Sequence, residues 1–336
     1  ETSGAASAYN NLGRLYRETD PAQAELAFRR ATELAPGFAQ AWYNLSQLLP
    51  EMGRIAEGMD AWAQATVLAP QNAPAEHHAR ALVHLGRTSE AIALYQAQLE
   101  RDPDNPLVRH HLAALLKPDT PTRASDAYVE TVFDGFAATF DGKLAQLNYR
   151  APTLIREALA GIYPAAEARL AIADAGCGTG LCGPLVLPWA QQLVGFDLSC
   201  GMLAQAKARA IYHELHQAEL VHYLGDHPAA FDVVVCADTL CYCAGLIEPL
   251  GAAFTALRPG GHLVYTVEML DTDADNHRLL PSGRYAHSHA HVMASAAGAG
   301  FAVLAVRRET LREEAGRPVT GWLVTLMRAA PAGPTS

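Results

Sequence analysis

The apolar positions in the first third of the chain recur at helical spacing and form units of about 34 residues. Three prolines, Pro36, Pro70 and Pro103, close these units. The middle unit has large residues at helical spacing, a glycine at its turn and small residues where two helices would meet: Trp42, Leu45, Leu49, Gly53, Gly58, Trp62 and Ala65. This pattern predicts a stack of helix pairs.

The units on either side are less regular. The first contains Tyr9 and Phe28 but is one residue short at the turn near Asp20. The third is also one residue short and has Glu76 where the pattern prefers an aromatic residue. Residues 107–116 repeat the first-helix pattern and no second helix follows, so we expect them to cap the stack.

After residue 121 the pattern changes. Residues 128–149 predict helices that carry three phenylalanines, two of them followed directly by an acid: Phe133-Asp134, Phe136 and Phe140-Asp141. Beyond them, short apolar runs typical of buried strands alternate with helical segments, and we expect the last run to be antiparallel. These runs cover residues 170–174, 193–199, 231–238, 263–267, 301–306 and 322–327.

Composition narrows the class of protein. Of the 336 residues, 50% are hydrophobic and 18% charged, which is enough apolar surface for two globular domains. The net charge is −10 and neither half is basic, which disfavours nucleic acid as a partner. The six cysteines lack paired C-x-x-C spacing, so we expect free thiols. No apolar run is long enough to span a membrane and no signal peptide precedes the repeats, so we expect a cytoplasmic protein.

A glycine-rich loop directly follows the first expected strand, in the run Asp174-Ala175-Gly176-Cys177-Gly178-Thr179-Gly180. Residues 178–183 match the G-x-G-x-x-G pattern of dinucleotide-binding proteins, with Asp197 near the position of a ribose-binding acid. The Asp174 carboxylate would repel a pyrophosphate, however. It can instead order the glycine-rich loop. The run resembles the D-x-G-x-G-x-G motif of class I S-adenosylmethionine-dependent methyltransferases.

Further motifs extend this resemblance. Asp197 ends the second strand, Glu219-Leu220 follows the third, and Leu257 to His262 matches a turn that is typical of the family. The first third of the chain resembles the tetratricopeptide repeat, and residues 5 to 328 together resemble bacterial predicted methyltransferases with such repeats ahead of the catalytic domain. The resemblance implies an α + α/β chain. A repeat array with a capping helix would span residues 5–117, and a Rossmann-like domain with a mostly parallel seven-stranded sheet would span 118–330, with leading helices at 122–160.

The resemblance also implies a donor site for S-adenosyl-L-methionine, with S-adenosyl-L-homocysteine as product. Asp197 would hold both ribose hydroxyls and Glu219 the adenine amino group, while Arg150 would pair with the methionine carboxylate or lie on the surface. The complete set of expected donor residues is Tyr149, Arg150, Asp174, Gly176, Cys177, Gly178, Gly180, Asp197, Leu198, Met202, Glu219, Leu220 and Ala237.

For catalysis we consider residues near strand ends or in the polar stretch after the fifth strand: Asp238, Tyr242, Arg284, Tyr285 and His287. Asp238 is a site acid, or else a helix cap or loop-ordering acid. His287 contacts the substrate or acts as general base, or else makes a structural hydrogen bond. His287, His289 and His291 alternate, but no cysteine or acid completes a ligand set, so we expect no metal. Ser288 is expected to cap a helix beginning near His289.

These inferences predict methyl transfer to a peptide or protein recruited by the array. Two alternatives remain: a small-metabolite methyltransferase whose array serves assembly, and a non-catalytic adaptor that senses the donor. The resemblance places the peptide groove on the first helices, lined by Asn10, Arg14, Arg17, Gln40, Tyr43, Gln47, His77, His84 and His110.

Overall fold

The computed structural model describes residues 2–116, 120–272 and 274–330. The chain divides into two compact units, one built on residues 1–116 and the other on residues 117–313 and 318–336. Within the described residues, no helix has the length and apolar character needed to cross a membrane.

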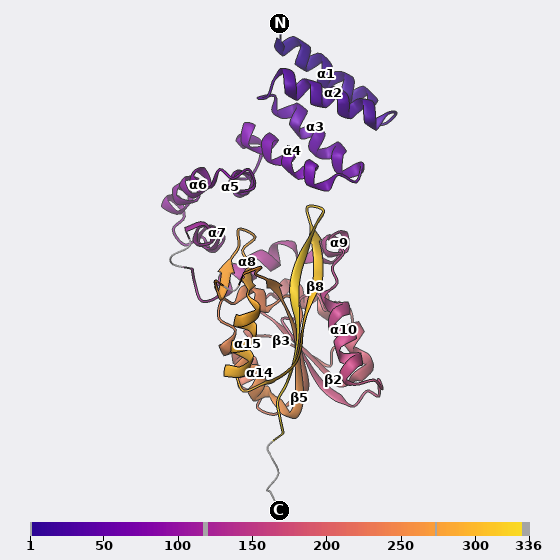
Figure 1. Ribbon diagram of the computed structural model, residues 1–336, viewed down its shortest axis with the longest axis vertical. Helices are drawn as coiled ribbons and strands as arrows, with labels where there is room; N and C mark the ends of the chain where they lie inside the picture. The colour runs from indigo at the N-terminus through magenta and orange to yellow at the C-terminus, as the bar shows by residue number, and fades with distance from the viewer. Residues whose placement is uncertain (1, 117–119, 273, 331–336) are drawn as a thin grey trace, which may run out of the picture. The chain divides into compact units, whose positions relative to one another are not determined.

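The first unit consists of antiparallel helix pairs in which each helix contacts the next, as α1 to α4 illustrate in Figure 1. Its helices are α1 (Thr2–Tyr16), α2 (Pro21–Leu34), α3 (Ala39–Glu51), α4 (Ile55–Leu68), α5 (Ala75–His84), α6 (Thr88–Arg101) and α7 (Pro106–Leu116), with a 3-10 turn, η1 (Pro70–Asn72). Three pairs followed by the single helix α7 agree with the expected array and cap.

Local sequence explains how these helices start and meet. The Asp20 side chain accepts a hydrogen bond of 3.1 Å from the Gln23 amide, which caps α2 just before Pro21. A Cβ atom at position 13 would lie 2.6 Å from the Phe28 ring, so Gly13 lets α1 and α2 approach closely. Phe28 and Leu48 are fully buried in the core of the first two pairs.

The second unit begins with helices and continues as an α/β domain. Its helices are α8 (Asp126–Phe136), α9 (Phe140–Gln146), α10 (Ala151–Ile162), α11 (Gly183–Val186), α12 (Cys200–Ala208), α13 (Leu220–Gly225), α14 (Ile247–Ala256) and α15 (His289–Gly298), with 3-10 turns η2 (Ala137–Thr139), η3 (Leu187–Trp189) and η4 (Leu240–Tyr242). Its strands are β1 (Leu170–Ala175), β2 (Ala190–Asp197), β3 (Glu214–Gln217), β4 (Phe231–Cys236), β5 (Leu257–Met269), β6 (His277–Leu279), β7 (Tyr285–His287), β8 (Ala302–Glu314) and β9 (Arg317–Met327).

The described strands form one sheet in the order β3-β2-β1-β4-β5-β7-β6, with β9 also pairing with β5 and β8 pairing with β9. Strands β1 to β5 are mutually parallel, and β9 runs antiparallel to β5, as expected. The short hairpin β6–β7 was not predicted. It lies in the polar stretch after the fifth strand, and it joins the sheet through parallel pairing of β7 with β5.

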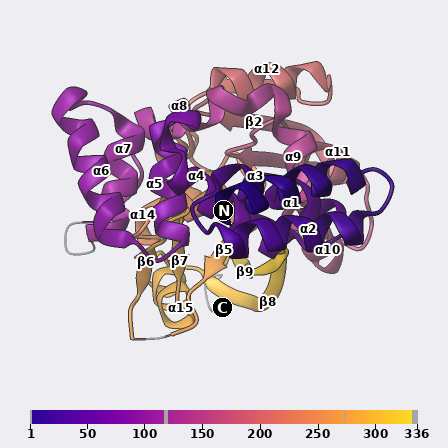
Figure 2. The same cartoon turned by 90° about the horizontal axis from the view of Figure 1, so that it is seen from above.

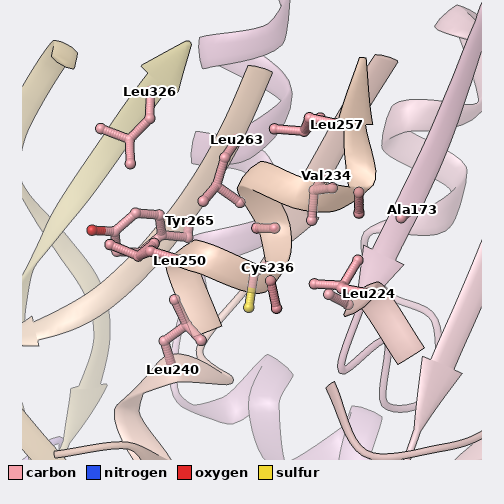
Figure 3. Packing of buried hydrophobic residues seen from close by; sticks show 14 of the residues in the cluster. Ala173, Leu224, Val234, Cys236, Leu240, Leu250, Leu257, Leu263, Tyr265 and Leu326 are labelled. Carbon is pink, nitrogen blue, oxygen red and sulfur yellow. The ribbon is translucent and has the colours of Figure 1, made fainter. Parts of the chain in front are cut away.

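Alternating residues of the central strands point to opposite faces of the sheet, and both faces are buried. Val234 and Leu263 pack with Leu250 of α14 on one face, which Figure 3 shows from close by. Val233 and Ile172 pack with α10 on the other face. Figure 1 accordingly shows α14 and α15 on one side of the sheet and α10 on the other. This three-layer arrangement brings the carboxyl ends of β1, β2 and β4 to one edge, where open α/β sheets bind ligands.

Candidate active site

The glycine loop after β1 has the backbone that its sequence requires. Gly176, Gly178 and Gly180 have φ angles of 66°, 54° and 83°, in the left-handed region that favours glycine. A Cβ atom at Gly176 would collide with Thr239 from the loop after β4. Apart from Gly178 and its two chain neighbours, no heavy atom of the described residues lies within 4 Å of the position that a Cβ would take at Gly178, so the space beside this glycine is open.

Asp197 links this loop to the end of β2. One carboxylate oxygen accepts a hydrogen bond of 2.9 Å from the Gly178 amide, and the other accepts one of 2.9 Å from the Ser199 amide. Burial raises the pKa of the Asp197 carboxyl, and these amides counteract that effect. Each oxygen keeps a second lone pair, which suits a ligand with two neighbouring hydroxyl groups.

Asp174 is 1% exposed at the end of β1 and has a partner that the sequence analysis did not identify. The Tyr212 hydroxyl donates a hydrogen bond of 2.6 Å to its carboxylate. Burial raises the pKa of the Asp174 carboxyl to about 7. No sequence signal pointed to Tyr212, which lies between α12 and β3.

The helices before the sheet are fastened to the loops after β1 and β2. Asp134 of α8 accepts hydrogen bonds from the Ser199 hydroxyl (2.5 Å) and the Gly201 amide (2.9 Å). Helix α8 consequently lies against α12, as Figure 2 shows. Asp141 of α9 accepts a hydrogen bond of 2.5 Å from the Thr179 hydroxyl in the glycine loop. The two Phe-Asp pairs noted in the sequence thus hold these helices over both loops.

Asp141 also pairs with Arg209, whose Nε donates a hydrogen bond of 2.5 Å to the Thr179 carbonyl. Arg209 therefore contacts helix α9 and the glycine loop at the same time. The side chains of Asp141 and Arg209 are 50% and 26% exposed, so we expect their ion pair to contribute modestly to stability.

The aromatic side chains of these helices extend toward the loop after β4. The ring of Phe133 meets Tyr242 of η4 edge to face, with centroids 5.6 Å apart. The Tyr242 carbonyl accepts a hydrogen bond of 2.8 Å from Ala124, just before α8. Burial raises the pKa of the Tyr242 hydroxyl to about 12, and burial together with the charge of Asp238 also raises the pKa of Tyr149. Both phenols are therefore neutral near pH 7.

A buried ion network lies beside these phenols. Asp238 has a left-handed φ of 53° and accepts hydrogen bonds from the Thr266 hydroxyl (2.9 Å) and from Arg312 (3.0 Å). Arg312 also pairs with Glu268, and Arg284 lies 3.6 Å from the same Glu268 carboxylate. Two cations thus balance two anions at the carboxyl ends of β4 and β5. The sequence analysis identified Asp238 and Arg284 but neither Glu268 nor Arg312.

His287 and Tyr285 do not have the environment that we expected. Both are fully buried in β7, and the Tyr285 hydroxyl donates a hydrogen bond of 2.6 Å to the Pro121 carbonyl. Neither ring nitrogen of His287 makes a hydrogen bond with a described residue. Burial, with His291 and His277 nearby, lowers the pKa of His287 to about 3. A fully buried imidazole with this pKa does not fit a general base working near neutral pH, because no acceptor reaches it.

The remaining expected donor residues lie around the same edge of the sheet. Glu219 caps α13 by accepting a hydrogen bond of 3.0 Å from the His222 amide and lies 3.6 Å from Arg123. Met202 is fully buried at the start of α12, and the Arg150 side chain is exposed just before α10. Four more residues occupy the ends of β1, β2 and β4 or the start of α13: Cys177, Leu198, Leu220 and Ala237.

The alternating histidines do not converge. His287 and His291 stack on each other with centroids 5.5 Å apart, whereas His289 contacts Trp322 instead. The described residues contain no group of three or more His, Cys, Asp or Glu side chains that could hold a metal ion. Ser288 caps α15 through a hydrogen bond of 3.2 Å from the His291 amide, which confirms the expected cap.

The expected groove residues of the array differ in accessibility. Asn10 is buried and accepts a hydrogen bond of 2.8 Å from Asn44, and His110 is also buried, so both are corrected from groove-lining to interior positions. His84 contacts Asp60 at 2.7 Å, and Arg17 pairs with Glu51 at 2.6 Å. The other expected groove residues are exposed: Arg14, Gln40, Tyr43, Gln47 and His77.

Comparisons with known proteins agree with this architecture. Residues 173–263 match the profile of a methyltransferase domain, and residues 6–38 and 76–115 match two tetratricopeptide repeat profiles. The human methyltransferase-like protein 27 is 40% identical over 84 residues, or 25% of this chain and 34% of that protein. Trans-aconitate 2-methyltransferase of Rhodopseudomonas palustris is 31% identical over 129 residues, or 38% of this chain and 49% of that protein.

The chain thus spans at most half the length of these two relatives. Among solved structures, the [4+2]-cyclase SpnF is similar with a TM-score of 0.51 at 16% identity, over 62% of this chain and 98% of that one. This similarity supports the fold alone, because one fold serves several chemistries. The chain therefore joins segments similar to tetratricopeptide repeats to a segment similar to methyltransferase domains, which lies in a mostly parallel sheet.

Proposed function

We propose that the second unit binds S-adenosyl-L-methionine and transfers its methyl group to an acceptor held beside Asp238 and Tyr242. The observation that carries the proposal is the Asp197 carboxylate, which accepts one amide from the glycine loop and one from the loop after β2. This carboxylate suits the ribose hydroxyls, and the open space beside Gly178 suits the methionine part of the donor.

The residues of the chain would mainly align the reactants and exclude water. The bound donor supplies a methyl group on a sulfonium, and its sulfur–carbon bond breaks as the acceptor–carbon bond forms. Asp134 and Asp141 hold the aromatic helices over the donor loops, so that Phe133 and Tyr242 cover the reacting atoms. For an acceptor that must lose a proton, we propose Asp238 as the base, because its side chain is 14% exposed while His287 is inaccessible.

For the acceptor we propose a peptide or protein segment recruited by the array. Exposed side chains on the first helices of the pairs, such as Tyr43, Gln47 and His77, support this choice, because such arrays usually bind extended or helical peptides. The second candidate is a small metabolite. The similarity to trans-aconitate 2-methyltransferase and the deeply buried cation Arg312 beside Asp238 favour it.

The test uses a donor with a labelled methyl group. Proteins captured by the full chain are incubated with it, and mass spectrometry looks for a gain of one methyl group. A chain starting at residue 121 should bind S-adenosyl-L-homocysteine as before but lose turnover on a macromolecular acceptor. Undiminished turnover in this truncation would favour the small-metabolite candidate, and the absence of donor binding in the full chain would contradict both.

A further inference from the structure

The side chain of Tyr212 fills a cradle made by three glycines. Cβ atoms at Gly180, Gly183 and Gly195 would each lie 2.8 to 2.9 Å from an atom of Tyr212. These glycines come from the loop after β1, the start of α11 and the interior of β2. At Gly183 and Gly195, close approach of Tyr212 together with Ile211 or Leu215 therefore accounts for the missing side chain, and no ligand is needed to explain it.

The hydroxyl of this tyrosine reaches the one buried acid at the end of β1. It donates a hydrogen bond of 2.6 Å to the Asp174 carboxylate, 38 residues earlier in the chain. Besides Tyr212, the Asp197 carboxylate acts on Asp174, and the charge of Asp174 in turn acts on the thiols of Cys177, Cys182 and Cys236. Burial raises the pKa of each of these thiols, so they are neutral near pH 7 and Asp197 is the only charged neighbour among them.

We infer that Tyr212 is a positioning residue of the donor site, which keeps the Asp174 carboxylate ionised and aimed at the base of the glycine loop. The inference rests on the proposed function. An ionised carboxylate only accepts hydrogen bonds, whereas its protonated form also donates one. The Tyr212 hydroxyl and the ammonium group of the proposed donor are both hydrogen-bond donors, so each favours the ionised form.

Opposing effects on the pKa of Asp174 make the role of Tyr212 measurable. Burial and the Asp197 charge raise the pKa of Asp174, the Tyr212 hydrogen bond lowers it, and the result is about 7. Tyr212→Phe keeps the ring in its glycine cradle and removes only the hydroxyl. Because a hydrogen bond to a charged group is lost, we expect this pKa to rise by about one unit.

The experiment measures the affinity of the full chain for S-adenosyl-L-homocysteine by calorimetry between pH 6 and 9. If the ionised form binds, Tyr212→Phe should weaken affinity about fivefold at pH 7 and leave it nearly unchanged at pH 9. Asp174→Asn should be weak throughout and show no ionisation step in this range. Tyr163→Phe is the matched control, since the Tyr163 hydroxyl hydrogen-bonds His262 at 2.8 Å, outside the donor loops.

Equal loss at every pH in Tyr212→Phe would overturn the inference, because it would mean that the tyrosine acts through packing alone. Wild-type affinity at every pH would overturn it too. Both outcomes leave the proposed function intact, because they presuppose that the wild-type chain binds the donor product. Failure of the wild-type chain to bind it at any pH would instead contradict the proposed function.

Discussion

Arg312 of β8 donates a hydrogen bond of 3.0 Å to Asp238, which lies 74 residues earlier in the chain. The same guanidinium pairs with Glu268, and the side chains of Arg312, Asp238 and Glu268 are 2%, 14% and 6% exposed. This cation therefore holds the carboxyl ends of β4 and β5 to the antiparallel part of the sheet.

Removing this cation should destabilise the second unit strongly. We expect Arg312→Met to lower the free energy of unfolding by about 3 to 5 kcal/mol, because Asp238 would lose its cation and Glu268 would keep only Arg284, 3.6 Å away. Urea unfolding of the full chain checks this. Arg308→Met is the matched control, since Arg308 is exposed on the same strand and should change stability by at most about 0.5 kcal/mol. Similar losses in the two variants would contradict the account.

The carboxylates of α8 and α9 should slow the release of the donor product. Asp134→Ala removes hydrogen bonds to the segment after β2, and Asp141→Ala removes one to the glycine loop after β1. We therefore expect S-adenosyl-L-homocysteine to dissociate about threefold to tenfold faster from each variant. Stopped-flow fluorescence measures this rate. Glu130→Ala on α8 serves as the control, because Glu130 takes no part in these hydrogen bonds. Unchanged dissociation in both aspartate variants would mean that these helices do not retain the ligand.

The buried His287 should make folding sensitive to acid. Its pKa is about 3 in the folded chain, whereas an unperturbed histidine has a pKa of about 6.5. The unfolded chain therefore takes up a proton below about pH 6.5 that the folded chain refuses, so stability is present above this pH and is lost as pH falls toward 3, by up to about 1.4 kcal/mol for each pH unit.

The variant His287→Phe isolates this contribution because phenylalanine cannot be protonated. Between pH 7.5 and pH 5, the wild-type chain should lose about 2 kcal/mol more of its unfolding free energy than the variant does. Urea unfolding at the two pH values measures the difference. Identical pH dependence in the two chains would show that His287 is not buried in its neutral form. In the pH–rate profile of any methyl-transfer activity, the same variant should show the same fall at low pH as the wild-type chain.

The glycine loop after β1 could be predicted from sequence because the residues that define it are neighbours in the chain. A short apolar run, an acid and three glycines needing left-handed φ angles occupy consecutive positions 170–180, and Asp197 follows at the end of the next strand. The helix pairs were equally predictable, since their apolar spacing repeats. In both cases each residue is positioned mainly by neighbours within one or two elements.

The rest of the site depends on contacts between distant positions. Tyr212 lies 38 residues from Asp174 and Arg312 lies 74 residues from Asp238, and no periodicity marks either pair. Tyr285 and His287 were misinterpreted for a related reason. The strand β7 is only three residues long and has polar flanks, so its burial comes from pairing with β5, which the local sequence does not reveal.

The central claim is that Asp197 and the glycine loop form a site for S-adenosyl-L-methionine. Calorimetry of S-adenosyl-L-homocysteine binding to the full chain tests it most directly, with Asp197→Ala beside it and the exposed Asp226→Ala as control. We expect the wild-type and control chains to bind alike and Asp197→Ala to lose about 2 to 4 kcal/mol of binding free energy. Tight binding of a nicotinamide dinucleotide by the wild-type chain, with no binding of S-adenosyl-L-homocysteine, would contradict the account.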